Sequence, residues 1–387
     1  MPDQFKTWGW VLLLFAAGLG AAGQFAKLAT GFELLVAAYP GAGPGLGLAI
    51  SLISFLGVAL GLVAGMIVTR LGFRTVLVAG LALGAGLSAY QTLLPPLPLL
   101  MLSRVAEGAS HLAIVVAAPT LIAQLTDDRQ RPVAMALWST FFGTGFALFA
   151  WAGLPLAEAR GPQAVIVLHA AAMAALALAV ALALPRRRIA PPSEPFGLRL
   201  VLARHWQVYR SPFMAAPALG WLCYTLTFVS VLTLLPRLVP DAPWLATALP
   251  LIGIVLSLSL VAALLRRVPA VRVVTAGFVL ATLWIPLIAL FPGSAAPWLG
   301  LFGTLALVQA GSFAAIPQLN DSARDRALAN GAVAQMGNLG NLAGTPLLLA
   351  GLSLGGSSLG LVSLAACYAA GAALHLGLAA LRLRTSR

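Results

Sequence analysis

Three ionisable side chains lie close together inside one long apolar stretch of this sequence. Arg104, Glu107 and His111 fall within the apolar run 97–125. Their spacing of i, i+3 and i+7 places all three on one face of a helix. A second apolar run holds Lys27. Cations beside a single acid can form an ion pair, bind an anion or take part in proton transfer.

Helices that cross a membrane must position these residues. The chain has 387 residues, of which 60% are hydrophobic and only 9% are charged, whereas about a quarter of a soluble domain is charged. Apolar stretches of about 20 residues span a bilayer as helices. The runs are too long and too evenly apolar for the alternating strands of a β-barrel. We predict an all-α membrane protein with twelve transmembrane helices, at 8–35, 46–69, 75–94, 98–124, 132–157, 162–184, 213–236, 244–265, 273–291, 298–318, 327–352 and 357–381.

The basic residues indicate how the spans are oriented. With a cytoplasmic N-terminus, nearly all arginines outside the spans fall in cytoplasmic segments, as the positive-inside rule requires. We expect both termini in the cytoplasm, in a multi-pass protein of the inner (plasma) membrane. The net charge of +13 is then a topology signal with anionic lipid as its neighbour, and no nucleic-acid partner is expected.

A basic segment divides the chain into two halves. We expect an N-terminal six-helix bundle at 1–185, a cytoplasmic linker at 186–212 and a C-terminal six-helix bundle at 213–387. Within the linker, one apolar stripe favours a helix lying on the membrane surface, and a regulatory or partner-binding helix is the alternative. The stripe contains Leu198, Leu202, Trp206 and Tyr209.

The two halves also resemble each other in sequence. Residues 131–145 read RPVAMALWSTFFGTG and residues 326–340 read RALANGAVAQMGNLG. Each begins with arginine and carries alanine three residues later and glycine at the end. Repeated halves with a substrate held between them are a common transporter design.

Together these features resemble the major facilitator superfamily, in its bacterial form with twelve helices. The first cytoplasmic hairpin, GMIVTRLGFRTVL, matches the family's loop signature at Gly65, Arg70, Gly72 and Arg74. Thr69 stands where the family usually has an aspartate that contributes to the cytoplasmic gate. The resemblance implies a gating role for Arg70 and Arg74, with Asp127 and Asp128 as candidate partners.

The fourth span resembles a second signature of the same family. There an arginine is followed by a glycine four residues later, and Arg104 and Gly108 fit this pattern. Glu107 occupies a place where a neutral residue is common. The resemblance covers essentially the whole chain and identifies no substrate.

Depth within the membrane brings the first-half residues together. At a rise of 1.5 Å per residue, Arg104 lies about 10 Å and Glu107 about 6 Å to the periplasmic side of the centre of the fourth span. On the same basis Lys27 lies about 8 Å and Gln24 about 4 Å to the periplasmic side of the centre of the first span. A charge at mid-bilayer costs about 2.5–3.5 kcal/mol, so these groups must face a watery cavity or one another.

Three readings of this cluster remain open. It can be an ion pair holding two spans together, a site with surplus positive charge for a carboxylate or another anion, or a proton relay. In the second reading Lys27, Arg104 and Gln24 bind the substrate. Glu107, with His111, then carries the proton, because an anion that engages Arg104 favours protonation of Glu107.

The second half offers hydrogen-bonding groups in place of charges. Tyr224, Gln309 and Asn338 are candidate substrate-binding residues, with bonding between helices as the alternative. The sequence contains no Walker lysine motif, HExxH or CxxC, so we expect neither an ATP-driven pump nor an enzyme. No metal or cofactor is expected either.

We therefore predict a monomeric, proton-coupled secondary transporter that moves a small or amphipathic organic anion by alternating access. One alternative keeps the fold and exports lipophilic or cationic compounds, with Glu107 as the partner of the cation. Another is a non-transporting sensor or assembly factor built on the same scaffold.

Overall fold

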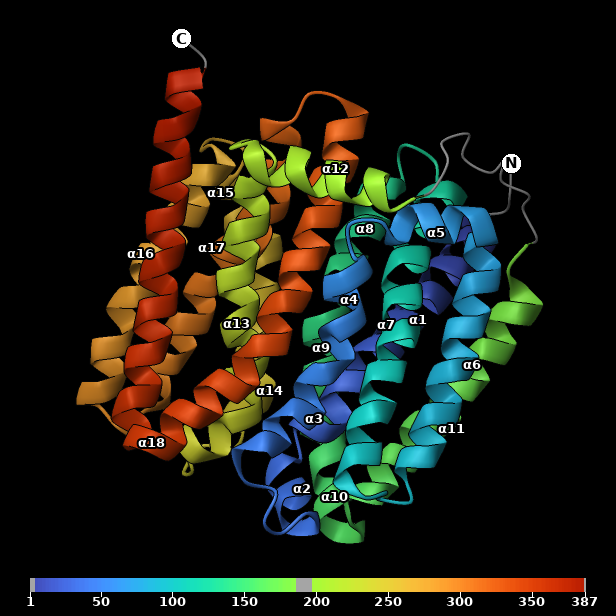
Figure 1. The fold of residues 1–387 in the computed structure, drawn as a ribbon, viewed down its shortest axis with the longest axis vertical. Coiled ribbons are helices and arrows are strands. Elements are labelled where there is room, and N and C mark those ends of the chain that lie inside the picture. The colour runs from blue at the N-terminus through green and yellow to red at the C-terminus, as the bar shows by residue number, and fades with distance from the viewer. Residues whose placement is uncertain (1–3, 186–196, 386–387) are drawn as a thin grey trace. The chain divides into compact units, whose positions relative to one another are not determined.

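The computed structural model describes residues 4–185 and 197–385, and every described element is helical (Figure 1). Eleven of the described helices are long and apolar enough to cross a membrane. The last of these, Arg324–Arg384, contains a break at Gly355 and Gly356, where Gly356 adopts a positive φ of 59°. The predicted spans 327–352 and 357–381 lie on either side of this break.

The chain divides into two compact units. One contains residues 1–43 and 63–195, and the other contains 44–62 and 196–387. The helices of the first unit are α1 (Gln4–Ala29), α2 (Phe32–Ala38), α5 (Ala64–Leu71), α6 (Phe73–Gln91), α7 (Leu97–Leu125), α8 (Arg131–Ser139), α9 (Phe141–Leu148), the π-helical turn η3 (Phe149–Gly153), α10 (Leu154–Arg160) and α11 (Pro162–Ala183). Those of the second are the 3₁₀ turn η1 (Gly43–Leu46), α3 (Gly47–Ser51), the 3₁₀ turn η2 (Leu52–Ser54), α4 (Phe55–Leu60), α12 (Leu198–Arg210), α13 (Ala215–Leu238), α14 (Leu245–Leu256), the π-helical turn η4 (Ser257–Val261), α15 (Ala262–Leu264), α16 (Ala270–Leu290), α17 (Ala295–Leu319) and α18 (Ala323–Thr385).

The second predicted span departs most from expectation. It is interrupted twice, by the 3₁₀ turn η2 and by the turn at 61–63. Its first part, residues 44–62, groups with the second unit although it precedes the linker in sequence. The reason is packing, since α3, η2 and α4 all contact α18 (Figure 1).

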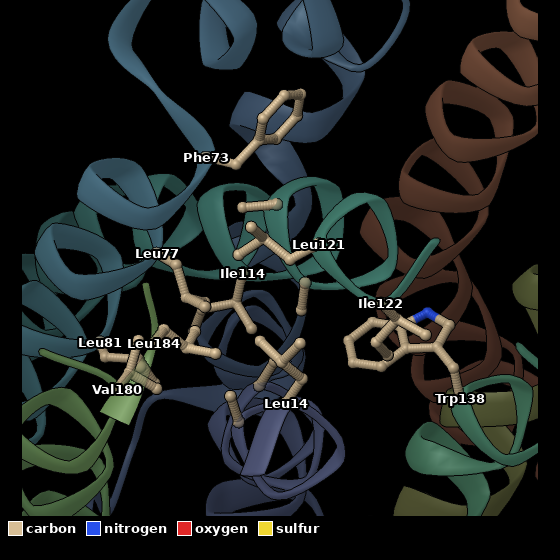
Figure 2. Close-up of a cluster of buried hydrophobic side chains, with 14 of the residues drawn as sticks. Leu14, Phe73, Leu77, Leu81, Ile114, Leu121, Ile122, Trp138, Val180 and Leu184 are labelled. Carbon is tan, nitrogen blue, oxygen red and sulfur yellow. The ribbon is translucent and has the colours of Figure 1, made fainter. Parts of the chain in front are cut away.

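In the first unit, α1 packs against α7, α9 and α11, while α6 packs against α7 and α11. A continuous apolar cluster fills the space among these helices, with Leu14, Leu77, Ile114 and Val180 all fully buried (Figure 2). Burial of each such side chain contributes about 1.5–3 kcal/mol when it leaves water. In lipid the same packing aligns the helices, and so it fixes the polar side chains one or two turns further along them.

The hairpin between α5 and α6 turns at Gly72, whose φ of 88° suits glycine because other residues carry a Cβ that clashes there. This is one of the glycines of the loop signature. The side chain of Thr69, the residue that departs from the signature, lies outside the described part of the chain, as does the basic run at 186–188.

Candidate functional site

An ion cluster joins α1 and α7 in the first unit. The Nζ atom of Lys27 lies 2.6 Å from Oε1 of Glu107, and Nη1 of Arg104 donates to Oε2 of the same carboxylate. The i, i+3 spacing on α7 brings Arg104 onto Glu107, and the packing of α1 on α7 supplies Lys27. The two cations therefore share one acid, as the depth argument anticipated.

Polar side chains of α6 and α11 extend this cluster. Lys27 donates to Ser88 Oγ at 2.6 Å, and Ser88 Oγ lies 2.8 Å from Nδ1 of His169, whose Nε2 lies 2.9 Å from Gly20 O. On the other side, Nε2 of Gln91 donates to Oε2 of Glu107 at 2.9 Å. Four helices thus contribute to one hydrogen-bonded network.

The network is sealed from solvent in this state. Lys27 is 3% exposed and both Arg104 and Glu107 are 0% exposed. The charged groups face one another. With two cations and one carboxylate, the cluster carries a formal charge of +1, and burial of a net charge is costly unless a counter-ion arrives. An anion can bind here only if the packing around the cluster opens.

Two predicted site residues lie beside the cluster without hydrogen-bonding to it. Nε2 of Gln24 donates to Ser110 Oγ at 2.7 Å. Nδ1 of His111 lies 3.2 Å from Ala21 O, and its ring packs edge-on against Phe25. These contacts place His111 as a buried, backbone-bonded side chain.

Sequence reasoning missed Ser88, Gln91 and His169. Each is a polar residue inside an apolar span, which is a signal for function or for polar contact between helices. Ser88 and Gln91 are three residues apart on one face of α6. A single sequence does not reveal that this face meets α1 and α7, or that α11 supplies His169.

The predicted gating residues have local partners. Arg74 donates through Nε to Leu184 O at 2.9 Å and through Nη2 to Ala181 O, and so it caps the end of α11. Asp128 pairs with Arg131 at 2.9 Å on the surface. Oδ1 of Asp127 accepts hydrogen bonds from two backbone N–H groups of its own loop. Arg74 is thus directed to α11, and neither described aspartate shows a contact to it.

The sequence repeat corresponds to the same local structure in both units. Arg131 donates to Ala123 O and Thr126 O, at the end of α7. Arg326 donates to Asn320 O, at the end of α17. Each repeat arginine therefore caps the helix that precedes it, where backbone carbonyls lack intrahelical partners.

The polar candidates of the second unit fall at two separate places. Tyr224 OH lies 3.4 Å from Oε1 of Gln309, joining α13 to α17. Tyr224 also stacks between Trp221 and Phe228, at ring distances of 4.6 and 5.5 Å. Asn338, on α18, donates to Ala334 O in its own helix.

A further polar junction ties the linker helix to the second unit. Gln335 donates to Val58 O at 2.7 Å, lies 2.8 Å from Nε2 of His205 and accepts from Tyr209 OH at 2.7 Å. One amide thus connects α4, α12 and α18. The hydroxyl of Tyr209 makes this contact, although Tyr209 belongs to the stripe predicted to face the membrane. The stripe residues Leu202 and Trp206 are exposed.

Comparison with known proteins agrees with the architecture. Residues 11–345 match the sequence profile of the Major Facilitator Superfamily. The solved structure of the human organic anion transporter MFSD10 (TETRAN) is similar at 18% identity with a TM-score of 0.70, covering 97% of this chain and 100% of that chain. No curated protein sequence matches this chain. The family resemblance and the all-helical membrane fold inferred from the sequence are confirmed.

Proposed function

Because the chain belongs to the Major Facilitator Superfamily, a family of membrane transporters and not of enzymes, we propose that it couples proton movement to the transport of an organic anion. The observation that carries this proposal is the sharing of one carboxylate, that of Glu107, by two buried cations. The MFSD10 structure is named for an organic anion transporter. At 18% identity that likeness concerns the fold, so the substrate class rests on the cationic pair.

In the proposed mechanism, anion and proton exchange places at this cluster. When the packing opens, a substrate carboxylate engages Arg104, which can hold it through two parallel hydrogen bonds. Glu107 then loses one of its cationic partners, and its neutral form becomes more favourable. Proton uptake by Glu107 lets the cluster close around the substrate with no additional buried charge.

Ser88 and His169 extend this scheme toward α11. A hydroxyl both donates and accepts hydrogen bonds, so Ser88 can transmit a change in the hydrogen bonding of Lys27 to the imidazole of His169. We propose His169, in place of His111, as the second titratable member of the relay. Both imidazoles contact a backbone carbonyl, and that of His169 also lies on the hydrogen-bonded path from Lys27 through Ser88.

The remaining expectations belong to the same proposal. The protein acts as a monomer in the inner membrane with both termini in the cytoplasm, and Tyr224, Gln309 and Asn338 contact the substrate. Arg70, Arg74, Asp127 and Asp128 contribute to the cytoplasmic gate. Energy for transport comes from the proton gradient, which supplies about 2.3 kcal/mol per charge for each 100 mV of potential.

One observation favours a second candidate, an exporter of lipophilic cations. The row of stacked rings Trp221, Tyr224 and Phe228 on α13 is suited to flat apolar or cationic molecules, because aromatic faces attract cations. In that case Glu107 is the counter-ion of the transported molecule.

Glu107→Gln distinguishes the two functions in proteoliposomes. We expect the variant to retain organic-anion binding and to lose uptake driven by an imposed pH gradient, while counterflow exchange of the anion persists. Loss of cation export with no effect on anions would favour the exporter. Transport of organic anions at the wild-type rate by both Arg104→Ala and Lys27→Ala, correctly inserted, would overturn the anion proposal.

A further inference from the structure

A line of buried polar groups runs between the interrupted second span and α18. Three glycines of the span bring its backbone close to α18, since a Cβ at each would lie against an α18 residue. The contacts are Gly47 with Pro346, Gly57 with Asn338 and Gly61 with Gln335. The span and the first part of α18 therefore run antiparallel in a fixed register. We call this contact the seam.

Ser51 and Ser54 occupy the span side of the seam. Ser51 follows Gly47 by four residues and Ser54 precedes Gly57 by three, so the helical repeat puts them on the face of those glycines. The 3₁₀ turn η2 between them superposes positions three apart, which aligns the two hydroxyls. Both serines are 0% exposed.

Asn341 and Thr345 occupy the α18 side, one helical turn apart. They lie between Asn338 and Pro346, the residues that meet Gly57 and Gly47. In the antiparallel register this places Asn341 opposite residues 51–54 and Thr345 beside the residue that meets Gly47. Thr345 is 0% exposed.

Among the described residues, the side-chain oxygens of these four have no hydrogen-bond partner. They are Ser51 Oγ, Ser54 Oγ, Asn341 Oδ1 and Thr345 Oγ1. Several hydroxyls elsewhere in the helices bond to their own backbone, as Ser230 does to Leu226 O at 2.7 Å. An unsatisfied buried polar group is costly, so four along this one contact between the span and α18 indicate that a ligand holds them.

The chemistry of the four atoms points to a cation. All are oxygens with lone pairs to offer, including the buried amide oxygen of Asn341. Hard cations bind oxygen donors, and interrupted helices at mid-membrane hold sodium in other transporter folds. No carboxylate lies among the four, which suits a monovalent ion better than a divalent one.

We propose that the seam binds a sodium ion through Ser51, Ser54, Asn341 and Thr345. The ion joins the second span to α18 and stabilises their contact. The proposal is independent of the proton-coupled function, because it involves no residue of the Lys27, Arg104 and Glu107 cluster.

Thermal unfolding of the purified protein in detergent tests the site, in NaCl, KCl or choline chloride at constant ionic strength. The expected result is a saturable rise in Tm with sodium, larger than with potassium and absent with choline. Binding of ²²Na⁺ to the same protein provides a direct readout. Equal effects of the three salts together with no ²²Na⁺ binding would overturn the proposal and leave water as the partner of these oxygens.

Variants assign the ion to the seam. Ser54→Ala and Thr345→Val each remove one oxygen with little change in volume, and we expect at least a tenfold loss in sodium affinity for each. Ser312→Ala is the matched control, because the hydroxyl of Ser312 is also buried and unpartnered but belongs to α17. Wild-type sodium affinity in both seam variants, or an equal loss in the control, would contradict the assignment.

Discussion

The charges of the buried cluster predict that neutralising Glu107 destabilises the protein more than neutralising Lys27 does. Lys27, Arg104 and Glu107 sum to a formal charge of +1 and are 3%, 0% and 0% exposed. Lys27→Met reduces the sum to zero and leaves the Arg104–Glu107 pair intact. Glu107→Gln raises the sum to +2 and leaves two cations facing each other without a counter-ion.

The magnitudes follow from the contacts that each variant removes. Loss of one partner from a buried ion pair destabilises by about 3–5 kcal/mol, and we expect Glu107→Gln to lie in this range. Lys27→Met leaves Glu107 bonded to Arg104 and Gln91 and Ser88 bonded to His169. Its main cost is therefore the loss of the hydrogen bonds that Lys27 donates and poorer packing, about 1–3 kcal/mol. The double variant retains one cation and should be at least 1 kcal/mol more stable than additivity predicts.

The assay is unfolding of purified protein in detergent for the wild type, the two single variants and the double variant. Lys6→Met is the matched control, since Lys6 packs over the Trp10 ring near the N-terminus, away from the cluster. Greater destabilisation by Lys27→Met than by Glu107→Gln, or strict additivity in the double variant, would refute the assignment of surplus positive charge.

Further predictions concern the other contacts. Gln335→Leu removes the junction of α4, α12 and α18, and we expect faster proteolysis in the linker with a stability loss of about 1–3 kcal/mol; unchanged proteolysis would argue against the junction. Burial raises the pKa of Tyr209 from its ordinary value near 10 to about 12. The folded state then holds the phenol proton of Tyr209 more tightly than the unfolded state does. The contribution of this group to folding stability is therefore complete below pH 10 and is lost as the pH rises toward 12. The rate of proteolysis in the linker, measured from pH 9 to about pH 12, should rise in the wild type and not in Tyr209→Phe. The same dependence on pH in both proteins would contradict this prediction. Gly344→Leu places a side chain against Leu226 O, and we expect a fall in Tm of several degrees, equivalent to about 1–3 kcal/mol or more; its control, Gly377→Ala, has open space and should be neutral. Asp128→Asn breaks an exposed ion pair with Arg131 and should change stability by less than about 1 kcal/mol. A larger loss would indicate that Asp128 makes a further contact in the cytoplasmic gate.

The sequence was sufficient to predict most of the membrane-spanning helices and the similar depth of Lys27 and Glu107. Apolar length determines the spans, and the rise per residue places both side chains at one depth. The place of His169 in the hydrogen-bonded network could not be predicted, because contacts between helices depend on how each helix is rotated about its axis. His111 was assigned a role from its helical face and from the near-neutral pKa typical of histidine, and its contact with Ala21 O was not foreseen.

The grouping of residues 44–62 with the second unit was likewise not predicted. Chain order favours the first bundle, whereas the close approach of Gly57 and Gly61 to α18 determines the contact. The serines of the seam look like ordinary small residues of a span. Only the register opposite Asn341 and Thr345 distinguishes them.

The central claim is that an anion at the cationic pair frees Glu107 to take up a proton. The most direct measurement is proton uptake when organic anions are added to purified protein in weakly buffered detergent solution containing a pH-sensitive dye. The account predicts about one proton taken up per bound anion by the wild type and none by Glu107→Gln. Anion binding to the wild type without proton uptake, or equal uptake by the variant, would contradict it.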